Sequence, residues 1–261
     1  MGYPDHYDPH LLSPIPRQPH RAEIGIVEPL PFLGTDIWTA YELSWLGPQG
    51  KPQIAIATIC FPADSPQLIE SKSLKQYLNS LNQTFFENVH STRTILERDL
   101  SLAVGGPVEV LLKLPEVFGK EEIEELSGES LDRLEVDIRE YRVNPDFLKA
   151  GKTVVEETLV SNLLKTNCPI TGQPDWAGIQ IRYRGPRIDR KGLLRYLVSF
   201  RQHQDFHENC VERIFMDLRR RCRPEMLTVY ARYTRRGGID INPFRTNCET
   251  TRPVNSRTAR Q

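Results

Sequence analysis

The alternation of hydrophobic and polar residues in the first half of the chain predicts a hairpin of two strands. Positions 37–45 alternate with a period of two, which is typical of a strand with one buried face. Glycines and prolines at 47–52 indicate a turn, and the apolar run at 53–61 predicts the second strand.

Hydrophobic residues then recur at helical spacing over 71–86, which predicts a first helix. Ser91 is a suitable N-cap for a second helix, which we expect to end at the two glycines at 105–106. A short apolar stretch at 108–114 predicts a third strand. Together these elements predict a unit of α+β type.

The second half of the chain repeats this order of patterns. A strand, a turn, a strand, two helices and a strand are predicted at 154–164, 169–174, 178–183, 193–198, 211–218 and 227–233. Short identities support an internal duplication, because the tripeptide at 50–52 precedes a similar one at 172–174 by 122 residues. A glutamate-rich stretch at 120–135 joins the halves, and we interpret it as a solvated connector.

Basic and acidic residues balance, with 34 of each among 261 residues, so the formal net charge is zero. A neutral chain lacks the basic excess that favours nucleic acids and anionic membranes, and we expect neither as a partner. The first twenty residues are polar and rich in proline, unlike a signal peptide, and the apolar run at 54–61 is too short to span a bilayer. We therefore expect a cytoplasmic protein.

Five cysteines are scattered along the chain, at positions 60, 168, 210, 222 and 248. Their odd number and the lack of an export signal argue against a disulfide framework. No pair has the spacing of a structural zinc site, so we expect no metal. Most of these thiols are expected to be buried packing residues.

Cys168 and Asp175 lie on either side of a predicted Pro/Gly turn. Loops positioned by a sheet often carry reactive groups, and we expect Cys168 to be more exposed than the mid-strand Cys60. At an offset of 122 residues the first half has Leu46 and Gln53, so it lacks both the thiol and the carboxylate. The alternative is a buried turn cysteine beside an aspartate that makes a local turn contact.

His207 and Glu208 stand at the start of a predicted helix. Histidine exchanges protons near neutral pH, so Cys168, Asp175 and His207 could form a nucleophile with acid and base partners. Alternatively, Glu208 only complements the positive end of the helix. His203 and His207 have the i, i+4 spacing of some metal sites, but no further ligand completes a known metal motif.

Two further clusters could bind a charged ligand. Arg236 and Gly237 lie in a turn after a strand, where arginine donors and accessible backbone N–H groups suit a phosphate; a solvated hairpin turn is the alternative. Glu70, Ser71 and Lys72 stand at a strand-to-helix junction, where Ser71 could simply be the helix cap. No glycine-rich dinucleotide motif follows any predicted strand.

Four separated motifs resemble those of the NADPH-dependent 7-cyano-7-deazaguanine reductases, the nitrile reductases of queuosine biosynthesis, in their longer two-module form. They are LIESKSLKQYLNSLNQTFF at 68–86, NCPITGQPDW at 167–176, FHENC at 206–210 and YTRRGGIDINPFR at 233–245. The resemblance implies a tunnelling fold of two tandem ββααββ modules with antiparallel sheets, assembled as a homodimer. The implied domains are an N-terminal extension at 1–20, a module with the substrate and NADPH motif at 21–118, an acidic connector at 119–150 and a catalytic module at 151–261.

The same resemblance implies the reaction and the roles of individual residues. NADPH would supply two hydrides that reduce a nitrile on a 7-deazaguanine to a primary amine, without a metal. Cys168 would form a covalent thioimide and Asp175 would donate the proton. The implied substrate contacts are Ile69, Glu70, Ser71, His207 and Glu208, and the implied cofactor contacts are Ser71, Lys72, Arg236 and Gly237. One active site would then combine residues from both halves of the chain.

Three other functions would use some of these residues. A cysteine-dependent amidohydrolase would use Cys168, Asp175 and His207 without NADPH. A zinc-dependent purine or pterin hydrolase of the same fold would need a ligand spacing that the sequence lacks. A non-catalytic nucleotide-binding module at the arginines of 219–236 would be expected to carry interleaved aromatic residues and a basic charge.

Overall fold

The computed structural model describes residues 4–261, so the first three residues of the extension predicted at 1–20 lie outside the described part. The chain forms two compact units. The first contains the described residues up to His20, together with Thr35–Glu122 and Arg235–Asp240. The second contains Arg21–Gly34, Ile123–Thr234 and Ile241–Gln261.

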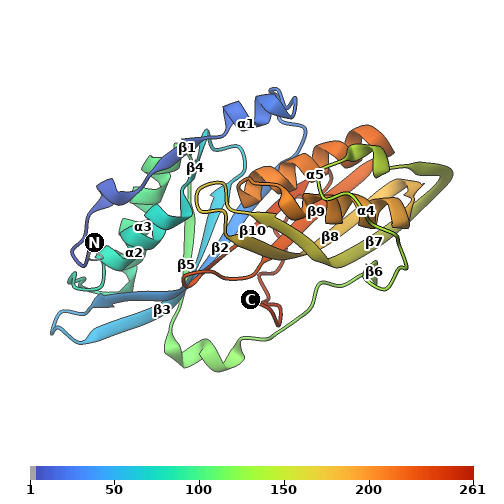
Figure 1. The fold of residues 1–261 in the computed structure, drawn as a ribbon. Coiled ribbons are helices and arrows are strands. Elements are labelled where there is room, and N and C mark those ends of the chain that lie inside the picture. The colour runs from blue at the N-terminus through green and yellow to red at the C-terminus, as the bar shows by residue number, and fades with distance from the viewer. Residues whose placement is uncertain (1–3) are drawn as a thin grey trace. The chain divides into compact units, whose positions relative to one another are not determined.

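The first unit is a small antiparallel sheet, with strand order β5-β3-β2, and two helices that pack on one of its faces (Figure 1). The elements of the chain up to Lys120 are, in order, η1 (Pro9–Leu11), β1 (Pro14–Pro16), α1 (Gln18–Glu23), β2 (Leu33–Leu46), β3 (Pro52–Pro62), β4 (Gln67–Ile69), α2 (Ser71–Ser80), α3 (Val89–Val104), β5 (Glu109–Lys113) and η2 (Pro115–Lys120). The strands predicted at 37–45, 53–61 and 108–114 are confirmed as β2, β3 and β5. The short strands β1 and β4 form a separate antiparallel pair.

The two helices of the first unit differ from the prediction at their ends. Helix α2 ends at Ser80, not at 86, because the backbone of 84–86 bonds instead to Leu46 at the end of β2. The N-cap predicted at Ser91 is wrong, because Asn88 caps α3. Its side chain accepts from the Ser91 N–H, and the Ser91 hydroxyl, at the third helical position, accepts from the Asn88 N–H to complete a capping box. The predicted C-terminus is confirmed at Gly105, whose φ of 72° is left-handed.

The second unit has a longer antiparallel sheet, with strand order β10-β9-β8-β7, to which β6 adds a short parallel edge. Its elements are β6 (Glu129–Ser130), η3 (Pro145–Phe147), β7 (Ala150–Asn167), β8 (Pro174–Ile188), α4 (Arg190–Ser199), η4 (Phe200–Gln202), α5 (His207–Cys222), β9 (Met226–Tyr233) and β10 (Ile239–Thr246). Every element predicted in this half is confirmed. Strand β10 was not predicted, because all its positions are buried and polar residues such as Asp240 and Asn242 interrupt its hydrophobic pattern.

The same side-chain contacts recur in both units. Tyr77 on α2 donates to Asp99 on α3 at 2.8 Å, and Tyr196 on α4 donates to Asp217 on α5 at 2.7 Å. Each tyrosine carbonyl also accepts from a serine three residues later, Ser80 or Ser199, at 2.6 Å. The Tyr–Asp bonds join α2 to α3 and α4 to α5, whereas the serine bonds lie within α2 and α4.

The segments that precede the two hairpins also match each other. Asp8 caps η1 and its N–H donates to Ser80 Oγ at 3.3 Å. Asn144 caps η3 and its N–H donates to Ser199 Oγ at 3.2 Å. The structural repetition therefore begins before the hairpins, in a turn that is Asp-Pro in the first unit and Asn-Pro in the second. This turn contacts helix α2 in the first unit and helix α4 in the second.

Helix α5 is anchored by a buried ion network. Glu212 accepts from Arg21 at 2.7 Å and from Arg245 at 2.9 Å, and both guanidinium groups lie over the ring of Phe32. Loss of one partner from a buried network leaves an uncompensated charge, which is costly. The network therefore fixes α5 one turn after its first residues, His207 and Glu208.

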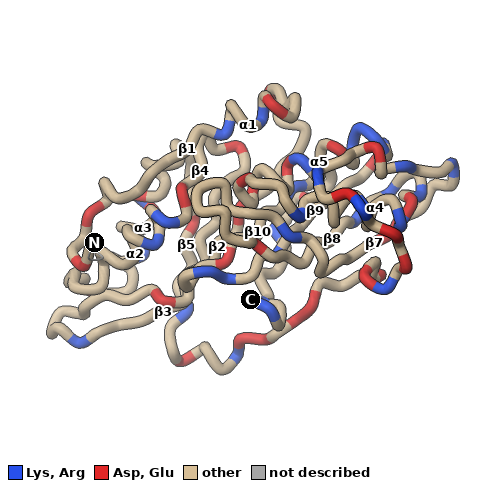
Figure 2. The backbone as a smooth tube through the Cα atoms, in the orientation of Figure 1, with Lys and Arg blue, Asp and Glu red and all other residues tan. Residues whose placement is uncertain are grey.

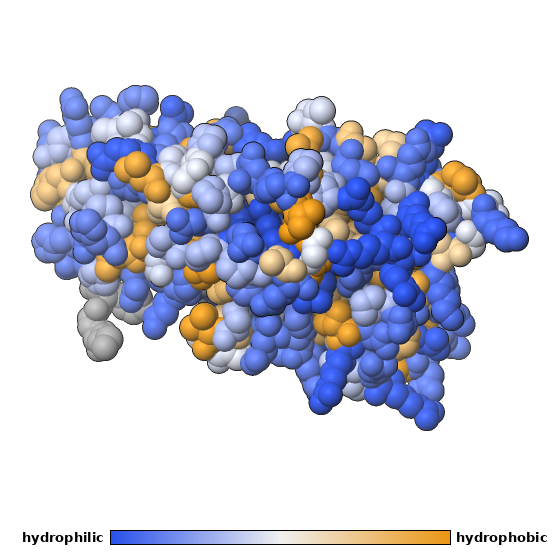
Figure 3. Space-filling view, turned by 90° about the horizontal axis from the view of Figure 1, so that it is seen from above, coloured by the Kyte–Doolittle hydropathy of each residue, from blue (hydrophilic) through white to orange (hydrophobic). Residues whose placement is uncertain are grey.

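Charges of both signs are interleaved along the tube of Figure 2, in keeping with the zero net charge. On the face seen in Figure 3, hydrophobic residues form separate small patches within a mainly hydrophilic surface. The connector predicted at 120–135 is largely exposed, apart from the buried Leu131. Within residues 4–261, no helix has the length and apolar character needed to cross a membrane.

Candidate functional site

Cys168 lies at the start of the turn that joins β7 to β8. Its N–H donates to the Gln173 carbonyl at 2.8 Å, and its own carbonyl accepts from Gly172 at 2.9 Å. Gly172 has a φ of 70°, a conformation that a residue with a Cβ adopts only with strain. The backbone thus holds the thiol at a fixed point at the end of the hairpin.

Asp175 lies on β8 directly opposite Thr166 of β7. Directly paired residues of neighbouring strands point to the same face, so Asp175 and Thr166 share one face. Cys168 is the first residue after β7 and is buried like both of them. The strand register also corrects the predicted correspondence with the first unit. Gly47, not Leu46, is the counterpart of Cys168, because the turn there closes from Gly47 to Lys51 and is one residue shorter. Gln53 remains the counterpart of Asp175.

His207 and Glu208 are the first two residues of α5, as predicted. His207 Nε2 lies 3.8 Å from Asp175 Oδ1, and the Glu208 side chain is buried. The structure therefore brings Asp175 and His207 together, and it positions the Glu208 carboxylate at the same helix end. The helix dipole stabilises a carboxylate at this N-terminal end. Glu208 can therefore complement the helix and also take part in the site.

The loop before α5 is bonded to the end of β7, next to Cys168. Asn167 N–H donates to the His203 carbonyl at 2.8 Å, and Asp205 N–H donates to the Asn167 carbonyl at 3.2 Å. Burial raises the pKa of Asp205, but the His203 imidazole, 3.6 Å away, and hydrogen bonds from Asn209 and the Phe206 backbone outweigh it and hold the pKa below its usual value. Asp205 therefore stays ionised and orders the approach to His207.

The exposure predicted for Cys168 is wrong. Cys168 is 7 % exposed and the mid-strand Cys60 is 6 % exposed, so the turn thiol is no more accessible. The turn itself is exposed at 169–173, although Cys168 at its start is buried. The predicted burial of most cysteines is confirmed, and Cys248 is the exposed thiol.

The other thiols of the second unit are poor candidates for a nucleophile. Burial raises the pKa of Cys210 well above its usual value and raises the pKa of Cys222 to about 11. A thiol is nucleophilic mainly as the thiolate, so both are inert near neutral pH. Neither residue lies in a turn beside a proton donor.

Tyr233 is a part of this cluster that the sequence pattern did not single out. Its ring packs edge-on against His207, with ring centroids 4.1 Å apart. Burial raises the pKa of its phenol well above the usual value, and the charges of Asp175 and Glu208 act in the same direction. Tyr233 therefore stays neutral and fixes the imidazole plane. Its place at the end of an apolar strand gave no signal of this contact.

The other predicted site residues lie in the first unit. Ile69 ends β4, and Glu70 follows it as the N-cap of α2. Its carboxylate accepts from the N–H groups of Lys72 at 2.8 Å and Ser73 at 2.7 Å. The cap is therefore Glu70 and not Ser71. Asp189 caps α4 in the same way, which makes it the structural counterpart of Glu70.

Arg236 and Gly237 lie in a tight turn in which Arg236 N–H donates to the Ile239 carbonyl at 2.9 Å. A Cβ built on Gly237 would lie 3.2 Å from Lys75 Nζ, so the turn sits against helix α2. Lys72 and Lys75 are three residues apart and lie on the same side of this helix. The structure thus gathers arginine, lysine and open backbone on one side of the first unit, a donor set that fits the phosphates of a dinucleotide.

The described residues include no group of three or more His, Cys, Asp or Glu side chains placed to hold a metal ion. The second unit instead offers a thiol, a carboxyl group and an imidazole, all partly or fully withdrawn from solvent. Such a set can form a covalent adduct at sulfur while a proton is supplied nearby.

Two family models match the chain. The one described as nitrile reductase, 7-cyano-7-deazaguanine-reductase N-term, matches residues 3–112, and that of the QueF-like proteins matches residues 174–252. A solved structure, of the archaeosine synthase QueF-Like in the apo form, is similar to 38% of the chain and 96% of its own, with 13% identity and a TM-score of 0.33.

Curated relatives match over the full length. The NADPH-dependent 7-cyano-7-deazaguanine reductase of Burkholderia multivorans is 58% identical over 261 residues, which is 99% of this chain and 95% of that protein. The protein of the same name from Burkholderia pseudomallei is 59% identical with the same coverage. The chain therefore belongs to the family of NADPH-dependent 7-cyano-7-deazaguanine reductases.

Proposed function

We propose that this protein reduces the nitrile of 7-cyano-7-deazaguanine to an aminomethyl group with two NADPH, a step of queuosine biosynthesis. The observation that carries the proposal is the placement of Cys168, Asp175 and His207 around one hairpin end, in a chain that is 58% identical to reductases of that name. Consumption of NADPH in the presence of the nitrile tests it. An amidohydrolase with the same nucleophile would leave NADPH untouched.

The first chemical step uses residues of the second unit alone. The Cys168 thiolate forms a bond to the nitrile carbon while one carbon–nitrogen π bond breaks. The released electron pair takes the proton of Asp175, which leaves a carboxylate and a neutral thioimide. His207, 3.8 Å from Asp175, is placed to exchange protons with it.

Substrate binding uses carboxylates that accept the N–H donors of a purine-like ring. We assign this role to Glu70 and Glu208, with Ile69, Ser71 and His207 as further contacts. Glu208 is buried at a helix end, and each oxygen of Glu70 accepts one backbone N–H, which leaves a lone pair on each for a ligand donor.

Bound NADPH supplies the hydrides that turn the thioimide into the amine. Ser71, Lys72, Arg236 and Gly237 are the residues that we expect to hold it. Arginine offers planar paired donors to a phosphate, and a glycine turn lets backbone N–H groups approach closely. The contact of Gly237 with helix α2 supports this grouping.

We further propose the tunnelling fold of two ββααββ modules, a homodimeric assembly and a cytoplasmic location. The recurring Tyr–Asp and cap contacts of the two units support the modular repeat. We also propose domain boundaries at 1–20, 21–118, 119–150 and 151–261. The compact units divide the chain differently, with Arg21–Gly34 in the second unit and Arg235–Asp240 in the first.

Glu70→Ala is expected to weaken nitrile binding at least about tenfold, because ring donors left unpaired in a desolvated pocket cost about 1–3 kcal/mol. The variant also loses a helix cap, which lowers the free energy of unfolding by about 1 kcal/mol. Asp189→Ala is the matched control, since it removes the equivalent cap of α4. Titration of the nitrile and urea unfolding of both variants separate the two effects. Equal nitrile affinities would reduce Glu70 to a structural cap.

Arg236→Ala is expected to raise the KM for NADPH about tenfold or more while the KM for the nitrile changes little. A charge-assisted contact to phosphate contributes roughly 1.5–3 kcal/mol, which sets the size of the effect. Steady-state kinetics with NADPH and NADH measure it, with the exposed Arg219→Ala on α5 as control. A change confined to the nitrile KM would contradict the phosphate role.

A further inference from the structure

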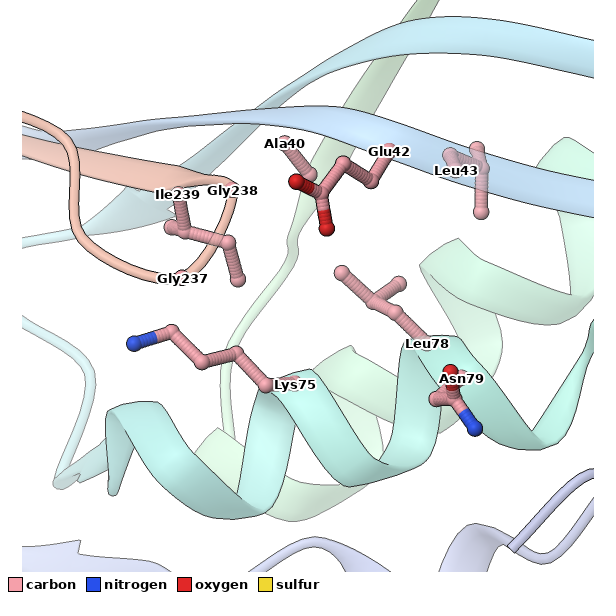
Figure 4. Close-up of a pocket in the computed structure, with 9 residues that line it drawn as sticks. All are labelled: Ala40, Glu42, Leu43, Lys75, Leu78, Asn79, Gly237, Gly238 and Ile239. Atoms are coloured by element: carbon pink, nitrogen blue, oxygen red, sulfur yellow. The ribbon is translucent and has the colours of Figure 1, made fainter. Parts of the chain in front are cut away.

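A cavity of about 240 Å³ opens in the first unit between strand β2 and helix α2 (Figure 4). Its apolar walls come from Ala40, Leu43, Leu78 and Ile239, and its two charges from Glu42 and Lys75. Pockets for complete drug-sized ligands span roughly 300–1,000 Å³, so this cavity suits one ring and its substituents. None of the site residues predicted from the sequence except Gly237 lines it.

The turn at 237–238 lies against both charged side chains of the cavity. Both glycines have left-handed φ angles, 60° and 74°. A Cβ on Gly238 would lie 2.5 Å from Glu42 Cδ, so only glycine lets this carboxylate pack directly against the backbone. The turn is pinned to β2 by a bond from Tyr41 N–H to the Gly238 carbonyl at 2.9 Å.

Figure 4 shows how the charged groups are arranged around the empty space. Lys75 extends from α2 beneath the turn, and Glu42 reaches from β2 toward Leu78 on the opposite side. The Lys75 ammonium group lies at the outer edge below Gly237, and the Glu42 carboxylate faces the interior between Ile239 and Leu78. A ligand that enters past the turn would therefore meet the ammonium group outside and the carboxylate with the apolar side chains inside.

We propose that this cavity holds one nucleotide half of the dinucleotide cofactor, with the amino group of its ring on Glu42 and its phosphate on Lys75. A flat ring suits the apolar walls, an exocyclic N–H₂ suits a carboxylate acceptor, and a phosphate suits an ammonium donor. The inference rests on the proposed use of NADPH and adds Glu42 and Lys75 to the contacts expected at Arg236 and Gly237.

The dinucleotide offers this chemistry at both ends, as the amino group of adenine and as the carboxamide of nicotinamide. Two fragments distinguish the sources: adenosine 2′,5′-bisphosphate carries only the first and nicotinamide mononucleotide only the second. Their Kd values can be measured by calorimetry on the full chain. The KM for NADPH provides a second readout that does not depend on fragment affinity.

The variants are Glu42→Gln and Lys75→Met, which keep side-chain length, with the exposed Glu87→Gln and Lys51→Met of the same unit as controls. We expect Glu42→Gln to weaken one fragment about fivefold or more and Lys75→Met to weaken the same fragment about tenfold, as for lost charge-assisted bonds. The fragment affected identifies the ring that fills the cavity. The KM for NADPH should rise in both variants and in neither control.

Unchanged Kd and KM values in both variants would overturn the inference. An equal loss for both fragments in Glu42→Gln would also overturn it, because one cavity holds one ring. Formation of the nitrile adduct without NADPH should be normal in both variants, which shows that they fold. If the wild-type protein forms the adduct and oxidises NADPH, the proposed function stands even when the Glu42 and Lys75 variants bind the fragments and NADPH normally.

Discussion

Cys168→Ala is expected to abolish nitrile reduction while the protein stays folded. The nitrile carbon accepts a hydride poorly until a nucleophile has added, so loss of the thiol removes the first chemical step. The side chain is buried at a turn, and deletion of one sulfur atom should lower the free energy of unfolding by only about 1 kcal/mol.

Intact mass of the protein after incubation with the nitrile alone measures this step directly. The wild type should gain the mass of one nitrile, and Cys168→Ala should gain none. Cys222→Ala is the matched control, because it removes a buried thiol of the same unit that has a raised pKa. An adduct that survives in Cys168→Ala would show that another group is the nucleophile.

Asp175→Asn should slow adduct formation by about a hundred- to ten-thousand-fold, the usual contribution of a positioned general acid. The amide has nearly the same shape and can still contact His207, but it cannot protonate the nitrile nitrogen. Nitrile affinity should therefore change little, since the loss falls on the rate of the step and not on binding.

Single-turnover adduct formation, followed by mass or absorbance, separates the rate from the affinity. Asp217→Asn is a suitable control, because Asp217 is a buried carboxyl group of the same unit that accepts from Tyr196. A rate within about threefold of the wild type in Asp175→Asn would assign Asp175 a purely structural role, because general acid catalysis contributes far more.

The hydrophobic pattern predicted the strands well and the helix ends less well. Period-two alternation is a property of the strand itself, so β2 and β3 followed from local sequence. The end of α2 depends on residues 84–86 bonding to Leu46, a partner 38 to 40 positions earlier in the chain. The caps considered at Ser71 and Ser91 were wrong, because Glu70 and Asn88 stand close by and can also cap a helix. The backbone conformation decides which of these residues becomes the cap.

The roles of the candidate site residues stay a prediction, and their environment was not predicted from the sequence. Cys168, Asp175 and His207 came from motifs, whereas the burial of Cys168 and the bonds of Asn167 to residues 203 and 205 did not follow from the sequence pattern. The counterpart of Cys168 was misplaced by one residue because a fixed offset ignores the shorter turn at Gly47. Tyr233 packs against His207 and Glu42 lines the cavity of the first unit, and no local sequence pattern predicts either contact.

The most direct test of the proposed nitrile reduction is the number of NADPH molecules oxidised for each nitrile consumed. Reduction of a nitrile to a primary amine takes up two hydrides, and each NADPH delivers one. Wild-type protein with a limiting amount of 7-cyano-7-deazaguanine should therefore oxidise two NADPH per nitrile and yield the aminomethyl product. A ratio of one, or loss of the nitrile without oxidation of NADPH, would contradict it.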